Sequence, residues 1–101
     1  MTHSALVHWM PAEAGGVKAL PPVLRIIAQS LFVEDGTKWQ DGVWSVVLLF
    51  DRPPAEQTDR SPSEANVEFA FDTAPHERLH AGAWFSIHYG PVKVAEVEVL
   101  D

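Results

Sequence analysis

The chain has 101 residues, of which 47% are hydrophobic and 21% charged, with no cysteine and a formal net charge of −7 at pH 7. These values predict one globular domain, residues 1–101, that can bury a core, and they argue against a disordered chain. The absence of cysteine excludes disulfides, thiolate–zinc clusters and cysteine nucleophiles.

The acidic charge also bears on partners and location. The basic residues are scattered, with no two adjacent: Lys18, Arg25, Lys38, Arg52, Arg60, Arg78 and Lys93. Nucleic-acid binding takes most of its affinity from clustered cations, so nucleic acid is a disfavoured partner, although folding can still bring a few cations together. The sequence has no run of 18 apolar residues and no basic, apolar leader at its start. We therefore expect a cytoplasmic protein with no membrane partner.

Apolar alternation broken by turn residues predicts an all-β fold. The predicted strands cover residues 5–10, 23–33, 43–50, 67–71, 83–89 and 92–100. Gly15-Gly16, Asp35-Gly36 and Gly90-Pro91 supply turns. Residues 51–63 are polar, hold three prolines and form a long loop. Both faces of residues 43–50 are apolar, so this loop or another molecule is expected to cover the outer face.

The last predicted strand changes its inward face along its length. Val92 and Val94 have one parity, whereas Val97 and Val99 have the other. Because side chains alternate with a period of two, one extra residue near Ala95-Glu96, a β-bulge, restores the phase.

Bulges bend strands, and bent strands close barrels. The predicted fold is therefore a small closed antiparallel β-barrel of about six strands. Its predicted interior holds Val7, Val47, Phe69, Phe85, Ile87 and Val99, and Phe71 is expected to face inward because it shares the parity of Phe69.

Two stretches resemble the third, β-barrel domain of translation elongation factor Tu, and together they cover about two-fifths of the chain. Residues 5–22 hold a strand followed by an acidic residue, a Gly-Gly turn and a proline-bearing segment, here Glu13, Gly15-Gly16 and Pro21-Pro22. Residues 80–100 hold a glycine, an aromatic-aliphatic strand, a glycine turn and a valine-rich strand, here Gly82, Phe85 with Ile87, Gly90, and Val94 with Val99.

The resemblance implies a stand-alone barrel that acts as a non-catalytic binding module, with protein partners or, as an alternative, tRNA or another RNA. The family has an arginine after Gly-Gly and another in the final turn. Here Val17 is followed by Lys18, and Lys93 stands near the second position, so Lys18 and Lys93 are the implied partner contacts. No G-x-x-x-x-G-K-[ST] phosphate loop occurs, so neither GTP nor another cofactor is expected.

Residues 76–80 match H-E-x-x-H literally. On an α-helix, His76 and His80 would bind zinc and Glu77 would act as general base. However, Pro75 and Gly82 leave room for barely two turns. The extended motif has a glycine three residues and a third histidine six residues after the second histidine, and here these positions hold Ala83 and Ser86. A zinc-dependent hydrolase is therefore the remote alternative, and we expect no catalytic residue and no metal.

Trp84 and His88 share the strand face opposite Phe85 and Ile87. Large aromatics can close the ends of a small barrel, whereas exposed ones are enriched at the centres of protein interfaces. We predict Trp84 and His88 as contacts to a protein partner, or to a second copy in a homodimer, where one patch serves twice.

Overall fold

The computed structural model describes residues 2–11, 20–32, 44–56 and 62–101. Within these ranges the strands are β1 (His3–Trp9), β2 (Arg25–Leu31), β3 (Trp44–Phe50), β4 (Ser63–Phe69), β5 (Trp84–Tyr89) and β6 (Val92–Val99). Two single-turn 3-10 helices, η3 (Pro54–Glu56) and η4 (His76–Arg78), precede β4 and β5. The predicted turns at Gly15-Gly16 and Asp35-Gly36 lie outside the described residues.

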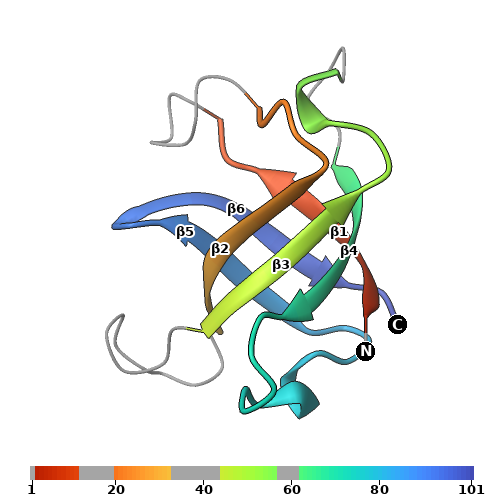
Figure 1. The fold of residues 1–101 in the computed structure, drawn as a ribbon, viewed down its shortest axis with the longest axis vertical. Coiled ribbons are helices and arrows are strands. Elements are labelled where there is room, and N and C mark those ends of the chain that lie inside the picture. The colour runs from red at the N-terminus through yellow and green to blue at the C-terminus, as the bar shows by residue number, and fades with distance from the viewer. Residues whose placement is uncertain (1, 12–19, 33–43, 57–61) are drawn as a thin grey trace.

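The strands pair antiparallel and close into one barrel in the order β1-β4-β3-β2-β5-β6, with β6 returning to β1 (Figure 1). This confirms the predicted all-β fold, a closed antiparallel barrel of six strands. In the described part of the chain, no helix is long and apolar enough to cross a membrane.

The barrel interior follows the predicted period of two. Five of the six predicted interior residues are at most 5% exposed and belong to the core cluster: Val7, Phe69, Phe85, Ile87 and Val99. The parity of these strands was therefore predicted correctly.

Val47 differs from the other five. It is buried, as predicted, but it lies outside the core cluster, because its neighbours Val46 and Leu48 point inward. Its register partners on the outer face are Ile27 of β2 and Glu68 of β4. Side chains of the two neighbouring strands therefore flank Val47 on the outer face, where Leu49 of the same strand is 37% exposed.

Aromatic rings close both ends of the barrel. Trp9 and Phe50 end β1 and β3 at one end, with ring centroids 6.1 Å apart. At the other end, the Phe32 ring lies 4.9 Å from that of Phe85 and 6.1 Å from that of Phe69. These are the positions expected of aromatics that plug a small barrel.

The predicted bulge is present in β6. Ile87 pairs with Ala95 but His88 pairs with Lys93, so Val94 is the extra residue. Val94 and Ala95 are both fully buried. Two consecutive buried side chains are what a bulge allows, and bulges bend strands as the closing of a barrel requires.

Phe71 corrects the predicted inward parity at the end of β4. The ladder between β3 and β4 ends at the Val46–Phe69 pair, and Phe71 is 59% exposed. Alternation governs direction only inside a strand, and Phe71 lies beyond the last residue of this one.

Candidate functional site

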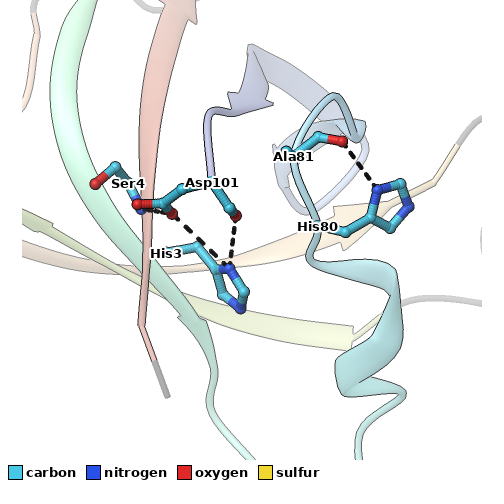
Figure 2. Close-up of polar contacts among 5 residues, drawn as sticks. All are labelled: His3, Ser4, His80, Ala81 and Asp101. Atoms are coloured by element: carbon cyan, nitrogen blue, oxygen red, sulfur yellow. Dashed lines mark hydrogen bonds and ion pairs between the residues drawn. The ribbon is translucent and has the colours of Figure 1, made fainter.

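The H-E-x-x-H segment does not form the helix that a zinc site requires. Residues 76–78 form one 3-10 turn, and Leu79 that follows is extended. His76 Nε2 donates to the carbonyl oxygen of Asp72 (2.9 Å), and His80 Nδ1 donates to that of Ala81 (3.1 Å; Figure 2). Both imidazoles thus contact the main chain. Among the described residues, no group of three or more His, Cys, Asp or Glu side chains could hold a metal ion.

Trp84 points outward at the start of β5 and is 44% exposed. Its indole stacks on the imidazole of His8 in β1, with ring centroids 5.2 Å apart and an interplanar angle of 25°. His8 Nε2 in turn lies 3.5 Å from Oε1 of Glu98, the register partner of Trp84. The contact with His8 therefore gives Trp84 a fixed orientation on the outer surface.

His88 lies at the other end of β5. It stands four positions after Trp84 in the strand, which corresponds to about 13 Å. Its Nε2 atom lies 2.8 Å from Ser86 Oγ, and its register partner is Lys93. Lys93 also forms an ion pair with Glu96 (2.7 Å). The predicted contact residues therefore fall into two groups, Trp84 alone and His88 with Lys93, while Lys18 lies outside the described residues.

Desolvation by burial and, secondarily, the Lys93 charge lower the pKa of His88 below its usual value of 6.5. As pH falls below that value, the unfolded chain takes up this proton more readily than the folded one, so the folded state loses stability. We expect the free energy of unfolding to decrease between about pH 7 and pH 5, and His88→Gln to reduce that decrease. Urea titrations of the wild type and of His88→Gln at pH 7 and pH 5 measure this change in the free energy of unfolding. Equal losses in the two proteins would contradict a role for His88.

A groove crosses the outer face of β1, β4 and β3, with a volume of about 320 Å³. Ser4 and Leu49 both pair with Asn66, so their side chains and that of Asn66 lie on the same outer face. Asp51 and Glu64 also line the groove, together with Leu100. We call this set the acidic groove: Ser4, Leu49, Asp51, Glu64, Asn66 and Leu100.

The end of the chain completes this groove. The main-chain N–H of Ser4 donates to Asp101 Oδ1 (2.7 Å), and His3 Nδ1 donates to the Asp101 main-chain oxygen (2.9 Å; Figure 2). The N–H of Leu100 donates to the Ser4 carbonyl oxygen (2.8 Å). These contacts hold Leu100, which is 47% exposed, against β1.

The acidic groove and Trp84 are connected by one row of outward side chains. Trp84 pairs with Glu98, Glu98 pairs with Leu6, and Leu6 pairs with Glu64. We call these four residues the outer row. Directly paired residues place their side chains on the same face, so the outer row crosses β5, β6, β1 and β4 and ends at the groove.

Sequence reasoning missed the groove, because its residues come from three strands and the chain end. The one sequence feature that could have indicated the groove is Leu49, an apolar residue that shares the outward parity of its strand. A second hollow of about 460 Å³ adjoins it, shares Asp51 and Glu64, and is also lined by Arg52.

No model of a known protein family matches the chain, and no curated protein matches it.

Proposed function

We propose that the chain is a non-catalytic binding module, similar to the third domain of elongation factor Tu without a GTP-binding domain. It acts in the cytoplasm and contacts a protein partner, or a second copy of itself, through its outer surface. The closed six-stranded antiparallel barrel supports the proposal, because this is the fold that the resemblance implies.

The observation that carries the proposal is the exposed, oriented side chain of Trp84. Tryptophan is among the residues most enriched at the centres of protein interfaces, because it buries a large area at little cost in side-chain entropy. Trp84 is 44% exposed although the barrel interior holds other aromatic rings. The His8 stack further restricts the indole before any partner arrives. Such preorganisation reduces the entropy that binding would cost.

The outer row also bears on the RNA alternative. Glu64 and Glu98 lie on it, and Glu96 stands beside Glu98 on the same face of β6. Carboxylates repel phosphates, whereas RNA binding depends on cations that neutralise them. This arrangement favours a polypeptide over RNA.

Replacing Trp84 with serine should reduce association while leaving the barrel folded, because the indole lies outside the core cluster. Two measurements test this: sedimentation velocity across dilutions for self-association, and selection of random displayed peptides on the immobilised barrel. We expect a partner-binding signal in at least one of them, and about a tenfold loss or more in Trp84→Ser, since buried interface tryptophans commonly contribute at least that much.

Phe71→Ser is the matched control, since Phe71 is also an exposed aromatic but lies in the connection after β4. We expect this variant to behave like the wild type. A wild-type barrel that remains monomeric and selects no peptides, or equal losses in the two variants, would contradict the proposal.

A further inference from the structure

The geometry points to a lysine- or arginine-bearing segment of a partner protein as the occupant of the outer row and the acidic groove. This inference rests on the proposed function, because it names the chemistry of the partner. The segment would cross β5, β6, β1 and β4, with an apolar residue on Trp84 and a basic side chain in the groove.

Acidic and apolar side chains alternate along the outer row. From β5 to β4 its residues are Trp84, Glu98, Leu6 and Glu64. Adjacent strands lie about 4.8 Å apart, so the two carboxylates stand roughly 10 Å apart, with a leucine between them. An extended peptide covers that span with about three residues. A segment whose cations are separated by apolar or small residues would match this row.

The acidic groove combines carboxylates with apolar side chains. Asp51 and Glu64 are both exposed and line it together. In the described part of the chain neither carboxylate has a hydrogen-bond or ion-pair partner. Leu49 and Leu100 stand at the same groove, 37% and 47% exposed. Lysine and arginine combine an apolar stem with a cationic head, so one side chain could cover a leucine and pair with a carboxylate at once.

The net charge of the chain bears on which occupant fits this surface. A second copy would carry the same net charge of −7 and the same carboxylates on its outer row. Opposed carboxylates disfavour self-association through this surface, whereas a basic segment gains both attraction and faster association. Arg52 lines the adjoining hollow together with Asp51 and Glu64. It is therefore a cation of the chain itself that competes with the partner's cation for these two carboxylates.

The direct test uses fluorescein-labelled nona-arginine as the probe, measured by anisotropy at about 0.15 M salt, where distant charges are screened. The double variant Glu64→Gln/Glu98→Gln removes both carboxylates of the outer row. The control, Asp72→Asn/Glu77→Gln, removes the same net charge from exposed positions in the connection between β4 and β5. We expect about a tenfold or larger loss of affinity in the first variant and less than about twofold in the control. Equal losses would show attraction to net charge alone and overturn the inference.

The variant Asp51→Asn/Glu64→Gln provides an independent measurement if the substitution at Glu98 disturbs the fold through His8, since both of its sites are exposed. This variant should also bind nona-arginine with about tenfold lower affinity than the wild type.

The peptide selection separates failure of this inference from failure of the proposed function. Selected peptides that need Trp84 and are enriched in lysine and arginine support both. Peptides that need Trp84 but lack basic residues, or a dimer that Trp84→Ser dissolves, overturn the basic partner and leave the binding module standing. No Trp84-dependent association of any kind overturns both.

Discussion

Replacing Phe85 with alanine is expected to lower the free energy of unfolding by about 3–5 kcal/mol, the usual range for a fully buried phenylalanine. Phe85 is 1% exposed and its ring packs 4.9 Å from that of Phe32. A closed barrel has hydrogen-bonded walls that cannot collapse into the space, so most of the cavity should remain. Urea unfolding followed by circular dichroism measures the change.

Two control variants bracket this expectation. Phe85→Leu keeps most of the volume and should cost less than about 1.5 kcal/mol. Phe71→Ala removes an aromatic ring that is 59% exposed and should change stability by less than about 0.5 kcal/mol. A cost below about 1 kcal/mol for Phe85→Ala, which is the surface range, would contradict the assignment of Phe85 to the core.

The strands and the bulge were predictable because they depend on local pattern. Period two assigns Val7, Phe69 and Ile87 to the interior without any knowledge of which strands pair. The change of parity between Val94 and Val97 required an extra residue, and the structure has it at Val94. Where a strand ends is less local. The ladder stops at the Val46–Phe69 pair although β3 begins two residues earlier, at Trp44, and the sequence of β4 does not encode this end.

The candidate surface was only partly predictable, because it depends on pairing between distant segments. Trp84 was identified from its parity alone. Its contact with His8 requires β1 and β5 to lie on either side of β6, with a specific register on both sides. The groove requires Ser4 and Leu49 to meet across Asn66. A one-residue change in either register would turn these side chains to the opposite face. The sequence supplies the residues, whereas the non-local pairing decides which of them meet.

Replacing Trp9 with alanine should have a comparable effect at the opposite end of the barrel, about 3–5 kcal/mol. Trp9 is 7% exposed, packs against Phe50 with ring centroids 6.1 Å apart, and donates from Nε1 to Ser63 Oγ (2.9 Å). Trp9→Phe keeps an aromatic ring but removes this donor from a buried hydroxyl, so its cost should be smaller, about 1–3 kcal/mol. Urea unfolding of the two variants separates the packing contribution from the hydrogen bond. If Trp9→Phe costs as much as Trp9→Ala, the ring itself contributes little, and the role of Trp9 in closing this end of the barrel would be wrong.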